Sequence, residues 1–154
     1  MKINEFGRSM VEMLGVLAII GVLSAGALAG YSKAMQKHRI NKTIDQMSTI
    51  INNMHTVFIN ARSERTPYED YKNKDATVDL ILLNVFPAEM VRGQEVYNVY
   101  QGQVRIVVDE EGRSFELQFD GLPQEASVAI STMDWGVGDA SGLQGVDIDT
   151  EGNS

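Results

Sequence analysis

GRSMVEMLGVLAIIGVLSAGALAGYS, residues 7–32, is the stretch of this sequence that decides the fold. From Met13 to Ser32 it holds 20 residues without a charge. A helix of that length rises about 1.5 Å per residue and so crosses a hydrocarbon layer of about 30 Å. A surface helix of a soluble protein alternates apolar and polar faces, whereas this run is apolar on every side until Lys33. We therefore predict a membrane-spanning helix.

Two other interpretations of the apolar run stay open from the sequence. The run could be the buried helix of a globular protein. It could also be a secretory signal, cleaved near the small residues 25–29, AGALA, which resemble a signal-peptidase site.

One carboxylate, Glu12, stands immediately before the apolar run. An ionisable group in a membrane span costs about 2.5–3.5 kcal/mol at the helix centre and therefore indicates a function. In the first turn of a helix, the dipole stabilises such a charge by about 0.3–1 kcal/mol. The alternative is that Glu12 is simply solvated in the headgroup region.

The residues around Glu12 resemble the processing signature of type IV prepilins and of the related pseudopilins of type II secretion. In that family a small residue, usually Gly, precedes the cleavage point, and a Glu occupies the fifth position of the mature chain. Gly7 and Glu12 stand in this register. The resemblance implies cleavage between Gly7 and Arg8, N-methylation of Arg8, and a role for Glu12 in filament assembly, opposite the amine of a neighbouring subunit. Arg8 departs from the family, which usually has an apolar residue there.

An apolar repeat continues the helix beyond the membrane segment. Neither Pro nor Gly interrupts residues 31–62, so we predict one helix from Ser9 to Arg62. Its second half would be an amphipathic spine for the C-terminal domain, or alternatively one strand of a coiled coil. The repeat consists of Ile40, Ile44, Met47, Ile51, Met54, Phe58 and Ala61, widened by Ile50 and Val57.

The remaining sequence predicts a small head domain. Asp75 should cap a helix over Ala76–Asn84 that Pro87 ends. The apolar side of this helix is expected to carry Val78, Ile81, Leu82 and Val85.

Alternating residues predict an antiparallel meander in the head. Its strands are expected at 95–101, 103–109 and 113–119, with a tight connection at Glu110-Glu111-Gly112. A helix beginning at Pro123 would then bury Ala126, Ala129, Ile130 and Met133, and Gly136 and Gly138 would stop it. A last strand at 143–148 would precede a polar tail.

The predicted fold is therefore α+β: a long N-terminal helix, transmembrane in its first half, packed on a small antiparallel sheet in a pilin-like head. The order of helix, meander, helix and strand is closest to the type IVb branch of the pilins. The predicted segments are a leader at 1–7, a membrane and assembly helix at 8–32, its amphipathic continuation at 33–62, and a head at 63–154.

Composition and motifs argue against several functions. A formal net charge of −8 argues against a nucleic-acid partner, and the absence of cysteine excludes disulfides and thiol chemistry. No catalytic motif is recognised, and no enzyme activity or cofactor is expected. His38 and His55 have no second ligand at metal spacing, and Trp135 is expected to fill a core. Weak calcium candidates, otherwise a solvated acidic surface, are Asp139, Asp147 and Asp149, with Asp134 and Glu151 beside them in sequence.

The charges that flank the apolar run conflict with the resemblance. The bases that follow it outnumber Lys2 and Arg8, which precede it, so the positive-inside rule favours a cytoplasmic C-terminal domain. The pilin resemblance implies that this domain lies outside the cytoplasm. The bases that follow are Lys33, Lys37, Arg39 and Lys42.

By resemblance, the chain is expected to be a structural subunit of a type IV pilus. Its expected partners are other copies of itself, a prepilin peptidase, the assembly platform in the inner membrane, and the lipid bilayer. It would reside in the bacterial inner membrane with a periplasmic head, and then in a pilus or periplasmic pseudopilus. The alternatives are a type II secretion pseudopilin, a minor pilin, and an uncleaved, signal-anchored binding protein.

Overall fold

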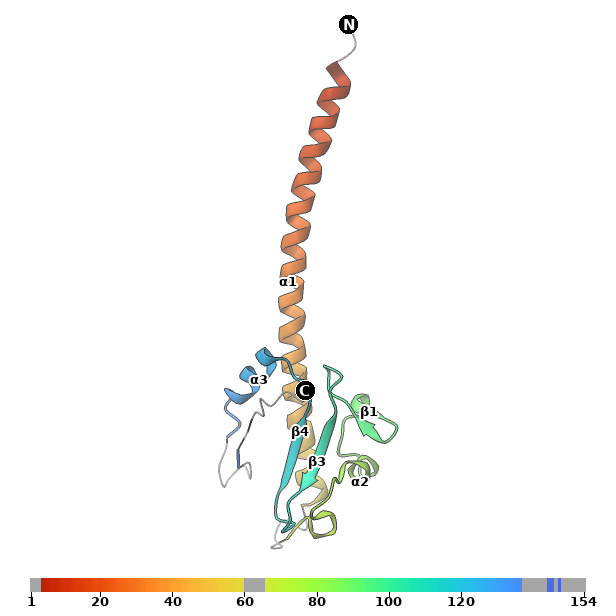
Figure 1. Ribbon diagram of the computed structural model, residues 1–154, viewed down its shortest axis with the longest axis vertical. Coiled ribbons are helices and arrows are strands. Elements are labelled where there is room, and N and C mark those ends of the chain that lie inside the picture. The colour runs from red at the N-terminus through yellow and green to blue at the C-terminus, as the bar shows by residue number, and fades with distance from the viewer. Residues whose placement is uncertain (1–3, 60–65, 137–143, 146, 148–154) are drawn as a thin grey trace, which may run out of the picture. The chain divides into compact units, whose positions relative to one another are not determined.

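A computed structural model describes residues 4–59, 66–136, 144–145 and 147 of the chain. The chain forms two compact units, residues 1–38 and residues 39–154, and we call the second one the head. Helices and short antiparallel strands together make an α+β fold with a long N-terminal helix, which confirms the predicted class. The elements are α1 (Asn4–Val57), η1 (Glu69–Tyr71), α2 (Thr77–Leu82), η2 (Ala88–Met90), β1 (Val91–Arg92), β2 (Glu95–Val96), β3 (Val104–Val108), β4 (Phe115–Phe119) and α3 (Gln124–Ser131) (Figure 1).

Helix α1 ends at Val57, before the predicted end at Arg62. In its last turn the Phe58 N–H donates to the Met54 carbonyl at 3.1 Å, and the Ile59 N–H donates to the Thr56 carbonyl at 3.4 Å. The Phe58 ring packs edge-on against Tyr68, with ring centroids 4.9 Å apart. The helix therefore ends next to the contact between Phe58 and Tyr68. The apolar repeat of the sequence does not indicate this end, because Tyr68 lies outside the helix. Residues 60–65 lie outside the described part of the chain.

The buried side of α1 in the head differs from the predicted stripe. Ile50 and Met54 are fully buried, as expected, but the polar residue Thr43 is fully buried too, and Gln46 is only 5% exposed. The Thr43 hydroxyl donates a hydrogen bond to the Arg39 carbonyl at 3.0 Å, which lowers the free-energy cost of burying this polar group. As a result, several stripe residues are only partly buried: Ile40, Ile44, Met47 and Ile51.

Strand β3 is the centre of the head. On one edge it pairs antiparallel with β4, from Val104↔Phe119 to Val108↔Phe115. On its other edge, the Ala76 N–H donates to the Ile106 carbonyl at 2.9 Å, and Asp75 forms a bridge with Val107. Val104, Ile106 and Val108 are buried, which confirms the predicted alternation.

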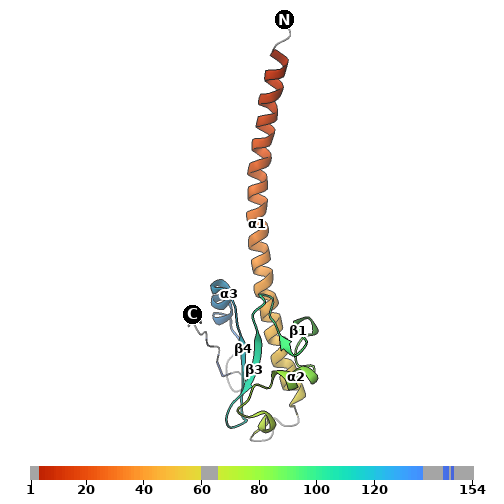
Figure 2. The same ribbon diagram turned by 45° about the vertical axis from the view of Figure 1, so that its right-hand side comes forward.

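The core surrounds this strand. Helix α3 lies on the β4 side of the head, and β1, β2 and α2 lie on the β3 side (Figures 1 and 2). The buried cluster consists of Ile50, Met54, Tyr68, Ala76, Leu80, Val85, Phe86, Met90, Val96, Val104, Ile106 and Val108.

The predicted strand 95–101 is wrong beyond Val96. Strand β2 covers only Glu95–Val96 and pairs with β1, a strand that the sequence pattern did not indicate. After Tyr97 the chain turns around Asn98, whose Oδ1 accepts hydrogen bonds from the N–H groups of Tyr100 and Gly102. The expected three-stranded meander is therefore two two-stranded sheets. The predicted connection at 110–112 does join β3 to β4, with Gly112 at φ 66°.

Helix α2 lies within the predicted range, but only Ile81 and Val85 of its predicted apolar side pack in the core. The predicted capping by Asp75 is wrong, because Ala76 is the N-cap residue and makes no side-chain cap. Asp75 lies one residue earlier, and its carboxylate accepts a hydrogen bond from the Thr77 N–H at 2.8 Å. Leu80 is buried, whereas Val78 is 46% exposed and Leu82 is 78% exposed. Contacts of α2 with β2 and β3 set this rotation, which a six-residue helix is too short to encode in its periodicity.

The end of α2 is set by Asn84 rather than by Pro87. Asn84 takes a left-handed conformation with φ 54°. Its N–H donates to the Ile81 carbonyl at 3.0 Å, and the Val85 N–H donates to the Leu80 carbonyl at 3.1 Å. These are the two hydrogen bonds of a Schellman motif, in which Asn substitutes for the more common Gly.

Helix α3 follows Pro123, which occupies the N-cap position rather than the first turn. Ala126 and Ile130 are buried as predicted, but Met133 lies past the helix and is 43% exposed. The Trp135 indole N–H donates to the Ile130 carbonyl at 2.7 Å and so caps the helix end. Of the predicted strand 143–148, the described residues 144, 145 and 147 are not in a strand, and the rest lie outside the described part.

Candidate functional site

The N-terminal part of α1 exposes its apolar side chains on every side. Their exposed fractions run from 52% to 74%, whereas the largest core side chains are below 2%. A soluble monomer rarely exposes a contiguous apolar patch larger than a few hundred Å². This surface therefore needs lipid or other protein around it. The side chains are Met10, Val11, Met13, Leu14, Val16, Leu17, Ile19, Ile20, Val22, Leu23, Leu28 and Tyr31.

Helix α1 is long and apolar enough to cross a membrane, judged by length and composition. None of its most apolar 18-residue window is buried within the protein. A core helix of a soluble protein would be mostly buried, so the buried-helix interpretation is wrong. Gly7 and Arg8 both lie in the first turns of this helix.

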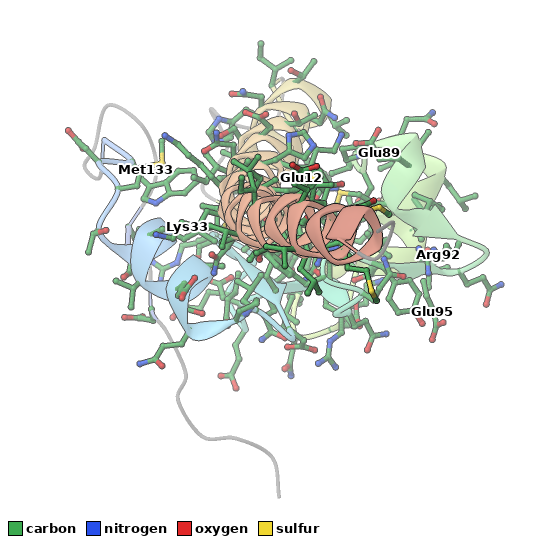
Figure 3. All side chains as sticks on the ribbon, turned by 90° about the horizontal axis from the view of Figure 1, so that it is seen from above. Glu12, Lys33, Glu89, Arg92, Glu95 and Met133 are labelled. Carbon is green, nitrogen blue, oxygen red and sulfur yellow. The ribbon has the colours of Figure 1, made fainter. Side chains whose placement is uncertain are left out.

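Glu12 lies on α1 (Figure 3), beside the first residues of the exposed apolar surface in sequence. It borders a shallow depression on the helix together with Ser9, Met13, Val16 and Leu17. Within the described part of the chain, this carboxylate has neither an ion pair nor a hydrogen bond to a side chain or backbone group. The arrangement is a lone anion on an otherwise apolar helix surface. The Glu12 carboxylate can therefore form an ion pair with a cationic group of a second molecule.

The proposed calcium residues are not brought together in what the structure describes. Asp147 is exposed, and Asp139, Asp149 and Glu151 lie outside the described residues. Asp134 uses its carboxylate to accept the Gly136 N–H at 2.9 Å. Across residues 4–59, 66–136, 144–145 and 147, no group of three or more His, Asp or Glu side chains could hold a metal ion.

The β1–β2 hairpin carries a polar cluster that sequence reasoning missed. The Tyr97 hydroxyl donates to the Glu95 carboxylate at 2.7 Å, and the Arg92 guanidinium lies 5.2 Å from the centre of the Tyr97 ring. The hydrogen bond from Tyr97 to Glu95 and the charge of Glu95 raise the pKa of the tyrosine. Arg92 and Glu95 are cross-strand partners, and Figure 3 shows both on this hairpin. The pairing of Arg92 with Glu95 across the two strands cannot be predicted until the register of the hairpin is known.

The remaining charged pairs on the head surface are also exposed. Arg105 and Asp120 lie 3.0 Å apart, with side chains 41% and 50% exposed. Lys42 and Glu89 form a similar exposed pair. Pairs of this kind contribute about 0–1 kcal/mol each.

A comparison with protein families identifies the chain. Residues 37–153, about three quarters of the sequence, match the family described as PilS N terminal. The chain belongs to this family. PilS N-terminal proteins are related to type IV pilins, so the protein is associated with type IV pili. Similar comparisons with curated proteins and with solved structures gave no match.

The match to the PilS N-terminal family does not overlap the prepilin-like segment. It begins at residue 37, after the apolar run, and covers most of the head. The resemblance to prepilins depends on residues 1–32. Two separate parts of the chain therefore lead to the same group of proteins.

Proposed function

We propose that this protein is a structural subunit of a type IV pilus. A prepilin peptidase would remove residues 1–7, methylation would modify the amine of Arg8, and residues 8–32 would drive assembly into a helical filament. The observation that carries the proposal is the N-terminal part of α1, exposed and apolar on every side, in a member of a pilin-related family.

Such a helix suits two environments in succession. In the inner membrane its apolar side chains would contact lipid, while the head would lie in the periplasm. In a filament the same side chains would contact those of neighbouring copies. Lipid tails are as apolar as leucine, so the hydrophobic effect does not drive this transfer, and close packing and polar contacts must do so. Gly15 and Gly21 have open space around them and would permit close helix approach.

Glu12 would set the register of assembly. A carboxylate buried among apolar helices without a partner is strongly unfavourable. The favoured arrangement therefore places a cation beside it, and the amine freed at Arg8 of a neighbouring copy is such a cation. A wrong register would leave both charges unpaired, which disfavours it.

Intact-mass spectrometry of the chain co-expressed with a prepilin peptidase tests processing. We expect the mass of residues 1–7 to be lost and the mass of one methyl group to be added. Gly7→Leu should leave the chain whole, because a bulky side chain replaces the small residue before the cut. Gly15→Ala, a change outside the cleavage site, should be processed like the parent.

Other outcomes, in the measured mass or in the assemblies that the processed chain forms, would contradict the proposal. An uncut parent chain would indicate a signal-anchored protein, and a cut near Ala29 would indicate ordinary secretion. A processed chain that forms only short periplasmic assemblies would indicate a type II secretion pseudopilin, and one found only at filament tips would indicate a minor pilin.

A further inference from the structure

The charges of this acidic protein are distributed unevenly along its sequence. Residues 13–44 contain none of its 21 acidic residues but four of its 13 basic ones. This segment thus has a formal charge of +4, and the rest of the chain, with nine basic and 21 acidic residues, has −12. All four bases lie between Lys33 and Lys42, directly after the apolar run. On the far side of a membrane these bases oppose the positive-inside rule, so they need another physical role.

With Lys33 at the boundary of the hydrocarbon core, two of these four bases would lie at the depth of the lipid headgroups. The headgroup layer on each side of the hydrocarbon core is about 5–8 Å thick. Lys37 is one helical turn beyond Lys33, a rise of about 6 Å, so both lie on one side of the helix and would fall within that layer, whereas Arg39, about 9 Å beyond Lys33, would fall past it. Lys42, about 14 Å beyond Lys33, already pairs with Glu89 in the head.

Both lysines are available to a ligand. They are exposed, and no ion pair to either one occurs among the residues that the structure describes. Figure 3 shows Lys33 on α1. Tyr31, two residues earlier, is 66% exposed, and tyrosines are enriched at membrane–water interfaces, where the ring is buried and the hydroxyl is wet.

The spacing of charges along α1 fits a membrane with these lysines at its surface. A helix rises about 32 Å from Glu12 to Lys33, close to the hydrocarbon thickness of about 30 Å. The anion and the first cation would therefore lie at opposite boundaries of the bilayer.

We propose that Lys33 and Lys37 bind the phosphate groups of anionic phospholipids, such as phosphatidylglycerol, in the leaflet nearest the head. This inference rests on the membrane-spanning part of the proposed function. An anionic membrane surface attracts each nearby lysine with a free energy equivalent to about fivefold in binding. Two lysines therefore give a preference of several-fold or more over a neutral lipid. The contact would hold the subunit at a defined depth before assembly.

The experiment measures which lipid surrounds this position in the full chain. Because the protein has no cysteine, Ser32→Cys provides a single attachment point for a fluorophore. The labelled chain is reconstituted in phosphatidylcholine vesicles that contain quencher-labelled phosphatidylglycerol or, separately, quencher-labelled phosphatidylcholine. The ratio of the two quenching constants gives the lipid preference.

We expect the parent to prefer phosphatidylglycerol by about fivefold or more. Lys33→Gln with Lys37→Gln should reduce the ratio to less than about twofold, whereas Lys33→Arg with Lys37→Arg should preserve it. Sodium chloride at about 1 M should weaken the preference by screening. The matched control, Lys72→Gln with Arg92→Gln, removes the same amount of positive charge from the head and should leave the ratio of the quenching constants unchanged.

Two outcomes would overturn the proposal. One is equal quenching by both lipids in the parent. The other is an unchanged preference after both lysines are replaced, and loss of filaments in that variant would then assign the lysines to a contact with a second copy. The measurement requires neither peptidase nor filament. An uncleaved chain with a lysine-dependent preference would therefore contradict the proposed function and leave the lipid site intact.

Discussion

At the scale of single residues, Asn98 holds together the turn between β2 and β3. Its side chain is 2% exposed. Its Oδ1 accepts hydrogen bonds from Tyr100 at 2.8 Å and Gly102 at 3.1 Å, and its Nδ2 donates to the Asp120 carbonyl at 2.8 Å. A Cβ at Gly102 would lie 1.7 Å from the Asp120 oxygen, so only glycine fits where this turn passes β4. One amide thus ties the start of β3 to the end of β4.

Asn98→Ala should destabilise the head by about 2–4 kcal/mol, because it removes three hydrogen bonds and leaves buried polar groups unpaired. Urea unfolding of the full chain in detergent, followed by the fluorescence of Trp135, measures this change. Asn52→Ala, at an exposed position of α1, should stay within about 0.5 kcal/mol of the parent. Equal stability of the two variants would show that the turn does not depend on Asn98.

The raised pKa of Tyr97 predicts that the stability of the head responds to alkaline pH. Its pKa is raised above its ordinary value of 10.0, first by the hydrogen bond to Glu95 and then by the charge of Glu95. A raised pKa means that the contact stabilises the folded protein below about pH 10 and that this contribution is lost as the pH rises through the raised value. Glu95→Gln should therefore lower the pKa of Tyr97, which a titration of phenolate absorbance detects.

Tyrosine assignment needs a control, because the chain has five tyrosines. In a Tyr97→Phe background, Glu95→Gln should leave the titration unchanged. A shift that persists in that background would assign the effect to another tyrosine and contradict the expected pairing.

At the scale of elements, α2 has two leucines with different environments. Leu80 is 1% exposed and contributes to the core, whereas Leu82, two residues later, is 78% exposed. The helix contacts β2 and β3, and these contacts determine which side is buried.

Leu80→Ala should therefore cost about 2–5 kcal/mol through lost burial and a cavity. Leu82→Ala should change the free energy of unfolding by less than about 0.5 kcal/mol. Both variants are compared with the parent by urea unfolding in the same detergent. Similar losses in both would contradict this assignment, because they would mean that Leu82 is buried as well as Leu80.

At the scale of the whole molecule, Glu12 is the one carboxylate of residues 8–32, and its proposed role appears only when copies assemble. Glu12→Gln keeps the shape of the side chain and removes its charge. We expect normal membrane insertion and cleavage, because neither the span nor Gly7 changes. Filament yield should fall by about tenfold or more, the equivalent of at least 1.4 kcal/mol lost per contact.

Sheared filaments quantified by electron microscopy and by immunoblotting provide the measurement. Glu89→Gln removes one carboxylate from the exposed head surface and should leave the yield near that of the parent. Normal filaments from Glu12→Gln would show that this residue is only a solvated flank of the membrane helix.

The sequence by itself determined the apolar helix, the central hairpin and the candidate assembly residues. Gly7, Arg8 and Glu12 could be proposed from the sequence because a processing signature depends only on the order of residues along the chain. The candidate membrane helix was readable because a run of 20 uncharged residues can be recognised without tertiary context. The β3–β4 hairpin was readable because Val104, Ile106 and Val108 recur at every second position, β4 alternates apolar and polar residues, and a short turn fixes the register.

Only the tertiary structure decided which sides of α1 and α2 are buried, where α1 ends, and how β1 and β2 pair. Thr43 and Gln46 are buried on α1, and Leu82 is exposed on α2. Short elements carry too few residues for a periodicity, and their orientation follows the neighbours that they meet. A turn around Asn98 stands where the sequence predicted a strand over 95–101. The hydrogen-bond partners of Asn98, Gly102 and Asp120, come together only in the folded head. Contacts between residues distant in sequence determine these features, and no local pattern records them.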